Sequence, residues 1–182
     1  MVADSRNRIL DGALELLRAE EGGSITLESA ARQVGLTKPG LMYHFPTKHA
    51  LMLAVVDHVA ARWERLLRER LGHPPQDASP YERISVYARV ALEAEFDRSD
   101  FAIFADAHYR PALTEAWTRH FEPWLMLPEE LPAHERASLL AGRLLADGYW
   151  ISAAAGLLTV GEPDRLALRA VLDGLLKGAE RR

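Results

Sequence analysis

Apolar residues recur at helical spacing along most of the chain, and the clearest repeat lies between residues 26 and 34. Its apolar positions fall at i, i+3, i+4 and i+7, which is one face of a helix: Leu27, Ala30, Ala31 and Val34. The Thr26 hydroxyl can accept a hydrogen bond from the first turn, so Thr26 is the expected N-cap. Gly35 supplies the left-handed residue that ends such a helix.

A second short helix is predicted immediately after this turn. Thr37 is its expected N-cap, and Pro39 falls in the first turn, where a missing N–H group costs nothing. The dipeptide Phe45-Pro46 is expected to end this helix before the next one begins. Two short helices joined by a tight turn that contains glycine are typical of a helix-turn-helix.

The remaining periodicity predicts an all-α fold of nine helices with no strand. Outside the helix-turn-helix, the expected helices cover residues 5–21, 47–71, 79–96, 101–109, 133–158 and 161–178, with one more beginning at residue 110. We expect residues 1–48 to form a helix-turn-helix DNA-binding domain. Residues 49–182 should form a helical domain for ligand binding and dimerisation.

The charge pattern singles out the same N-terminal region. The chain carries a formal net charge of -4, yet residues 32–48 contain Arg32, Lys38 and Lys48 and no Asp or Glu. A protein that grips phosphates needs such a patch, because counterion release provides most sequence-independent affinity for DNA. The alternative is an ordinary three-helix packing unit with a solvated basic edge.

Residues 8–51 match a known sequence pattern in register. The matching residues are Arg8, Ile9, Leu10, Ala13, Glu21, Gly22, Thr26, Leu27, Ala31, Gly35, Thr37, Lys38, Gly40, Leu41, Tyr43, His44, Phe45, Lys48 and Leu51. On these residues the segment resembles the DNA-binding domain of the TetR family of transcriptional regulators. The sequence departs from the family pattern at Leu17 and Gly23, where aromatic residues are common. Met42 occupies a recognition-helix position that varies with the operator.

The resemblance implies specific DNA contacts. The residues that would present the recognition helix in the major groove are Thr37, Lys38, Pro39, Gly40 and Met42. Those that would hold phosphates are Tyr43, His44, Thr47 and Lys48, with Thr26 adding a contact from the preceding helix. Backbone contacts should set affinity, and the groove-facing residues should set sequence specificity.

The middle helices are rich in aromatic rings with carboxylates among them. Rings of this kind line pockets for small apolar ligands, and carboxylates beside them would favour a flat, lipophilic cation. The residues expected to line a pocket are Trp63, Glu95, Phe96, Phe104, Trp117, His120, Phe121, Asp147 and Trp150. The alternative is plain core, with Asp147 capping a helix, bonding Arg143 or pairing across a dimer.

Two short segments are similar to the corresponding parts of short TetR-like repressors that sense toxic cationic drugs and control efflux pumps. They are AW at residues 116–117 and LLADGYW at residues 144–150. This resemblance implies a small-molecule effector. A ligand wedged among Trp63, Phe96, Trp117 and Phe121 would push the long fourth helix and change the separation of two reading helices. Such a switch needs a ligand with different affinities for the two states.

The last two predicted helices carry more apolar surface than one small bundle needs to cover. Small residues in them would admit another helix at close range: Ala141, Gly142, Ala146, Ala153 and Ala154. Pairing with a second copy would make a four-helix bundle, and the TetR resemblance also implies a homodimer. A dimer would read a near-palindromic double-stranded DNA operator. The alternative is that both helices are the core of a monomer.

Composition and the absence of known motifs exclude several classes of protein. The 182 residues include no cysteine, which excludes disulfides and thiolate metal sites and suits a reducing cytoplasm. No signal peptide is recognisable, and the most apolar late run is interrupted by Arg143 and Asp147, so we expect a cytoplasmic protein without membrane spans. No hydrolase elbow, zinc motif, phosphate loop or dinucleotide fingerprint occurs, and we expect no catalytic site, metal or cofactor.

The sequence therefore predicts a ligand-responsive transcriptional repressor. It would control an efflux or detoxification gene and leave its operator when a lipophilic small molecule binds. The competing class is a helical ligand-binding or scaffold protein that does not bind DNA.

Overall fold

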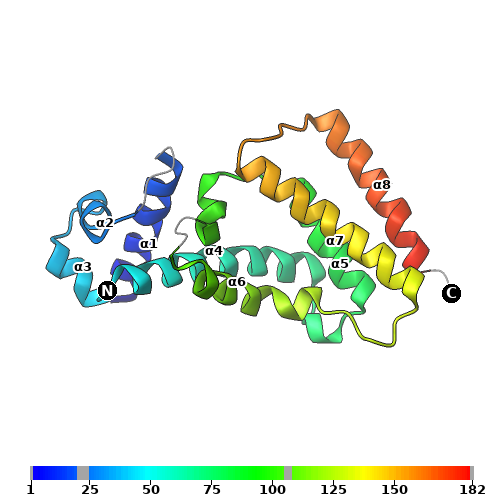
Figure 1. Cartoon of the computed structure of the whole chain (residues 1–182), viewed down its shortest axis with the longest axis horizontal. Helices are drawn as coiled ribbons and strands as arrows, with labels where there is room; N and C mark the ends of the chain where they lie inside the picture. Colours follow the sequence, from blue (N-terminus) through cyan, green and yellow to red (C-terminus); the bar gives the residue numbers. More distant parts are fainter. Residues whose placement is uncertain (1, 20–24, 105–107, 181–182) are drawn as a thin grey trace. The chain divides into compact units, whose positions relative to one another are not determined.

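The computed structural model describes residues 2–19, 25–104 and 108–180 (Figure 1). Within these ranges it has eight α-helices, two 3-10 helices and no strand. The α-helices are α1 (Val2–Ala19), α2 (Leu27–Gln33), α3 (Lys38–His44), α4 (Lys48–Leu71), α5 (Pro80–Glu93), α6 (Arg110–Leu125), α7 (Ala133–Ala154) and α8 (Glu162–Glu180). The 3-10 helices are η1 (Pro75–Asp77) and η2 (Arg98–Phe104). The all-α prediction is confirmed.

The prediction of nine α-helices was wrong by one, at residues 101–109. This region instead begins with the 3-10 helix η2, and residues 105–107 lie outside the described part of the chain. The Asp97 carboxylate accepts a hydrogen bond from the Ser99 backbone N–H at 2.7 Å, and Asp100 accepts one from the Asp97 N–H at 3.0 Å. Such local side-chain bonds compete with an α-helical start.

The end of α7 also differs from the sequence expectation, which continued this helix to residue 158. The helix ends at Ala154, and Gly156 adopts a left-handed conformation with φ of 68°. The Leu157 backbone N–H donates back to the Ser152 carbonyl at 2.9 Å, which closes the helix with a Schellman motif.

The chain divides into two compact units. Unit 1 comprises Met1–Ala61 and Asp97–His120, and unit 2 comprises Arg62–Phe96 and Phe121–Arg182. The helices α4 and α6 each contribute residues to both units. The two units reflect packing and not function. The expected division into a DNA-binding domain at residues 1–48 and a ligand-binding domain at residues 49–182 therefore remains a prediction.

In unit 1, α1 packs against α2, and α2 packs against α3. The fully buried side chains of this packing include Ile9 from α1 and Leu41 from α3. Gly12 allows α1 to approach the end of α2, because a Cβ atom there would lie 2.4 Å from the Val34 Cγ1 atom. The helix-turn-helix is therefore held on α1 by close backbone approach as well as by apolar burial.

In unit 2, α5, α7 and α8 pack against one another. Gly142 of α7 is buried, and a Cβ atom on it would lie 2.9 Å from Leu176 of α8 and 3.6 Å from Ile84 of α5. Ala146 and Ala154 are buried as well. The helix that approaches α7 at Gly142 is thus α8 of the same chain, and this small residue serves internal packing rather than contact with a second copy.

Candidate DNA-binding site

The start of α2 is fixed by a reciprocal cap. The Thr26 hydroxyl accepts a hydrogen bond from the Ser29 backbone N–H at 3.0 Å, and the Ser29 hydroxyl accepts one from the Thr26 N–H at 3.0 Å. Both bonds satisfy backbone donors that the first turn of a helix leaves open. Thr26 is confirmed as the N-cap of α2.

The turn between α2 and α3 is built around Gly35. This residue has a φ of 69°, while a Cβ atom on it would meet nothing within 4 Å. Its backbone conformation, rather than lack of space, therefore favours glycine. The Gly35 N–H donates to the Arg32 carbonyl at 3.2 Å and the Leu36 N–H to the Ala31 carbonyl at 2.9 Å, which together end α2.

The helix α3 has one buried side and one exposed side. Its N-cap is Thr37, whose hydroxyl accepts from the Gly40 N–H at 3.2 Å. Leu41 is completely buried, whereas the next two residues, Met42 and Tyr43, are 39% and 80% exposed. Because large apolar side chains are normally drawn inward, an α3 surface that presents a methionine and a tyrosine to solvent is suited to a partner.

Every residue predicted to contact DNA is accessible in the structure. The exposed ones are Thr26, Thr37, Lys38, Pro39, Met42, Tyr43 and Thr47, and the half-exposed ones are Gly40, His44 and Lys48. They come from the caps of α2, α3 and α4, from α3 itself and from the first residue of α4. Thr47 also accepts a hydrogen bond from the Ala50 N–H at 3.0 Å, which fixes the start of α4.

One acidic residue that the sequence argument passed over lies against this surface. Glu28, in the first turn of α2, forms an ion pair with the Lys38 ammonium group at the start of α3. The hydrogen bond from Lys38 lowers the pKa of the Glu28 carboxyl. Glu28 precedes the acid-free stretch 32–48, and only the turn of the chain brings it back to Lys38. In this structure the Lys38 charge is therefore already partly neutralised.

Glu28→Gln should strengthen binding to DNA of any sequence by roughly threefold to tenfold at low salt. The reason is that Lys38 loses its carboxylate partner and can pair with a DNA phosphate. Titration of a labelled duplex, followed by fluorescence anisotropy, measures the change. Glu15→Gln is the matched control, since Glu15 accepts a hydrogen bond from Gln33 at 2.7 Å and has no pairing with Lys38. Equal gains in the two variants would show that only net charge matters.

The aromatic residues expected to form a ligand site are partly gathered in unit 2. The rings of Trp63 and Phe96 stack with centroids 4.7 Å apart, and Phe96 lies 6.4 Å from the Trp150 ring. Phe121 lies 6.2 Å from the Tyr87 ring, edge to face. Trp63, Phe121 and Trp150 are buried.

Asp147 is held by two polar partners inside unit 2. The Tyr87 hydroxyl donates to one carboxylate oxygen at 2.5 Å, and Arg143 donates to the other at 3.3 Å. Burial, together with the Asp147 charge, raises the pKa of the Tyr87 hydroxyl, so this group remains a donor. Of the alternatives left open by the sequence, bonding to Arg143 is thus observed.

The other ligand candidates lie elsewhere. Glu95 is exposed and follows the end of α5 at Glu93, so the expectation that the helix continues to residue 96 was wrong. Trp117 and His120 are half-buried residues of unit 1, where His120 Nε2 lies 3.5 Å from an Asp57 oxygen. The Phe104 side chain lies outside what the structure describes.

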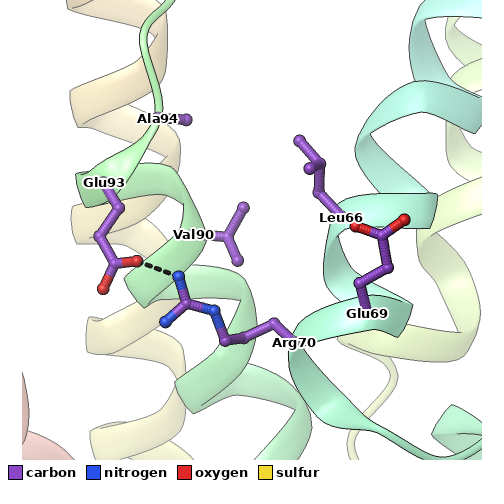
Figure 2. A pocket seen from close by; sticks show the side chains of 6 residues that line it. All are labelled: Leu66, Glu69, Arg70, Val90, Glu93 and Ala94. Atoms are coloured by element: carbon purple, nitrogen blue, oxygen red, sulfur yellow. Dashed lines mark hydrogen bonds and ion pairs between the residues drawn. The ribbon is translucent and has the colours of Figure 1, made fainter.

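A cavity of about 480 Å³ lies between α4 and α5 in unit 2 (Figure 2). It is lined by Leu66, Glu69, Arg70, Val90, Glu93 and Ala94. None of these residues was among the sequence candidates, although Leu66 follows Trp63 by one helical turn and Ala94 precedes Phe96 by two residues. The sequence gives no signal for it, because its wall forms only where α4 meets α5.

No helix in the described ranges is long and apolar enough to cross a membrane. Among the same residues, no group of three or more histidine or acidic side chains is arranged to hold a metal ion.

A capped two-helix unit with an exposed second helix, followed by a larger helical domain, defines a helix-turn-helix regulator. Comparison with protein families agrees. Residues 9–55 match the model for bacterial regulatory proteins of the tetR family, and residues 81–177 match the tetracyclin repressor-like C-terminal domain. The chain belongs to the TetR family of transcriptional regulators.

Individual relatives support this assignment over part of their length. The chain is 30% identical to the HTH-type transcriptional regulator RutR of Escherichia coli over 96 residues, which are 53% of this chain and 43% of RutR. It is 33% identical to the nucleoid occlusion factor SlmA of Marinobacter nauticus over 69 residues, which are 36% of this chain and 35% of SlmA. The matched region therefore spans less than half of either relative.

A solved structure shares the fold over nearly the whole chain. Salmonella enterica GusR superimposes with a TM-score of 0.57 and 19% identity, and the match covers 96% of both chains. At this identity the likeness shows the fold alone.

Proposed function

We propose that the protein is a dimeric, ligand-responsive repressor that binds a near-palindromic operator. Residues 1–48 act as the DNA-binding domain, and residues 49–182 bind the ligand and the second copy. The observation that carries the proposal is the accessible side of α3, where Met42 and Tyr43 point into solvent beside a surface with few acidic groups.

The DNA contacts follow from this exposed side. Thr37, Lys38, Pro39, Gly40 and Met42 present α3 to the major groove. Phosphates are held by Tyr43, His44, Thr47 and Lys48, and by Thr26 at the start of α2. Because Met42 projects from α3 without a polar partner atom, its contacts to bases are apolar, and they contribute to sequence preference more than to overall affinity.

Dimerisation is supported by two exposed apolar stripes in unit 2. On α7 the stripe consists of the exposed Leu140, Leu144 and Gly148 and the half-buried Ile151, which recur at i, i+4, i+8 and i+11. On α8 it consists of Ala167, Ala170, Val171, Gly174 and Leu175. Gly148 and Gly174 each have open space where a Cβ atom would lie, so another helix has room to approach. Two copies would bury both stripes in a four-helix bundle.

The ligand we propose is a lipophilic small molecule that releases the repressor from an efflux or detoxification gene. The aromatic group Trp63, Phe96, Phe121 and Trp150 supports this, because such rings dominate pockets for apolar ligands. Asp147, which belongs to the same unit, completes the proposed ligand set. The helix α4 is continuous between units 1 and 2, so a ligand that binds its second half acts on a helix that begins in the DNA-binding unit.

The proposal is tested by DNA binding with and without small molecules. Duplexes from the region beside the gene should be retarded in a gel at nanomolar protein, while a shuffled duplex should need at least 100-fold more protein. A panel of lipophilic dyes, followed by quenching of the four tryptophans, identifies ligands, which are then added to the complex. Indifference to every duplex at low salt would instead favour a ligand-binding protein that does not act on DNA.

Lys48→Ala should weaken binding to all DNA sequences alike and flatten the dependence of affinity on salt. Loss of one phosphate contact lowers the slope of log affinity against log salt by roughly one. Affinity measured at several salt concentrations gives this slope. An unchanged slope would remove Lys48 from the phosphate contacts.

A further inference from the structure

The cavity between the second half of α4 and the end of α5, called the groove below, has the size of a small-molecule site. Its volume of about 480 Å³ falls within the range of roughly 300–1,000 Å³ that ligand pockets occupy. Figure 2 shows Leu66 pointing from α4 toward α5 and Glu69 lying along α4 beside it, while Val90, Glu93 and Ala94 come from α5 and its end. All of these residues belong to unit 2.

The groove offers an apolar wall. Val90 is buried, whereas Leu66 remains 40% exposed, so part of this wall faces water. The stacked rings of Trp63 and Phe96 adjoin Leu66 and Ala94 along the chain. An alkyl or aromatic body placed against Leu66 would remove apolar surface from water, which favours binding by roughly 25 cal/mol for each Å² covered.

An ion pair joins α4 and α5 at the groove. Arg70 of α4 donates to one oxygen of Glu93 on α5, and Arg169 of α8 donates to the other oxygen (Figure 2 draws the Arg70 pair). The Glu93 carboxylate is therefore shared by two guanidinium groups. An anionic ligand would have to displace Glu93 from Arg70 before it gained its own pair.

Glu69 differs from Glu93 in lacking such a partner. Within the described part of the chain, its carboxylate has neither an ion pair nor a hydrogen bond. It lies on the same helix as Leu66, on the side of the groove opposite Glu93 (Figure 2). A cation can pair with Glu69 without breaking any interaction that is already present. This difference decides which sign of charge the groove favours.

We propose that this groove binds an amphipathic amine, with its apolar body against Leu66, Val90 and Ala94 and its ammonium group on Glu69. The inference rests on the ligand response proposed above, but it places the ligand in the groove next to the Trp63–Phe96 stack rather than among the aromatic rings, and it names a ligand class. It places the selective carboxylate at Glu69, rather than at Glu95 or at Asp147, which Tyr87 and Arg143 already engage.

The test compares three probes of one shape: phenylbutylamine, phenylbutanol and phenylbutanoate. Each is titrated into the full chain without DNA, and methyl NMR signals of Leu66, Val90 and Ala94 report binding at the groove itself. The amine should shift these signals with the highest affinity. Glu69→Gln should weaken amine binding by about fivefold, as expected for a solvent-exposed ion pair, and leave the alcohol unchanged. Glu64→Gln on the same helix, where Glu64 pairs with Arg68, should change neither.

Three results would overturn the inference: amine and alcohol binding equally, Glu69→Gln without effect on the amine, or the carboxylate binding best. Shifts confined to methyl groups outside the groove would overturn it as well. Because no DNA is present, these outcomes are independent of repression. If the amine binds at the groove but leaves operator affinity unchanged, the site stands and the proposed ligand response fails.

Discussion

Leu144→Glu should convert the proposed dimer into a monomer and lower affinity for a near-palindromic operator by roughly 100-fold or more. Leu144 is 67% exposed in the single chain, so a carboxylate there costs the folded monomer little. In a four-helix bundle of two copies, the same carboxylates would be buried without partners near the dimer axis. A monomer would bind with one α3 helix instead of two, and it would lose the gain in apparent affinity of about 10²–10⁴-fold that bivalent binding provides.

Sedimentation velocity gives the oligomeric state, and fluorescence anisotropy gives the operator affinity. Leu157→Glu is the matched control, because Leu157 is 78% exposed but lies beyond the end of α7 and outside the two stripes. It should leave both quantities unchanged. A Leu144→Glu variant that remains dimeric would move the interface away from α7.

The parts of this fold that the sequence predicts well are those determined by local chemistry. Thr26 and Thr37 were predicted as N-caps, and each accepts a hydrogen bond from the backbone N–H three residues later. Gly35 was predicted as the left-handed end of α2 and has that conformation. These interactions span only a few residues, so they are visible in the order of residue types.

The failures arise where local chemistry gives more than one outcome. Residues 101–109 have helical spacing, but the hydrogen bonds among Asp97, Ser99 and Asp100 favour a 3-10 start instead. Gly142 was expected to admit a second copy, yet its small size serves the packing of α8 on α7. A small residue indicates that a helix approaches closely without saying which one.

The charge arrangement of the candidate sites was beyond sequence reasoning, because its partners are far apart in the chain. The Arg70–Glu93–Arg169 group joins three helices, and the cavity beside it exists only once these helices are packed. Likewise, Glu28 meets Lys38 only because the Gly35 turn brings α3 beside α2. Exposure of Met42, by contrast, agrees with the position on the second helix that the TetR resemblance implied for it.

Leu41→Ala should destabilise the protein by roughly 2–5 kcal/mol and abolish operator binding at physiological temperature. Leu41 is completely buried and is the buried residue of α3, so truncation leaves a cavity under α3. Chemical denaturation followed by circular dichroism measures the loss of stability. A change below about 1 kcal/mol would mean that α3 packs on unit 1 much less firmly than its burial indicates.

Met42→Ala is the neighbouring control and separates packing from recognition. Met42 is 39% exposed, so its truncation should change the free energy of unfolding by less than about 0.5 kcal/mol. If Met42 contacts bases, the variant should alter the preference among operator sequences while nonspecific affinity stays constant. An equal loss on every sequence would instead assign Met42 to general surface contact. Two adjacent residues of one short helix would then give different results, because Leu41 is buried in the core of unit 1 and Met42 is exposed to solvent.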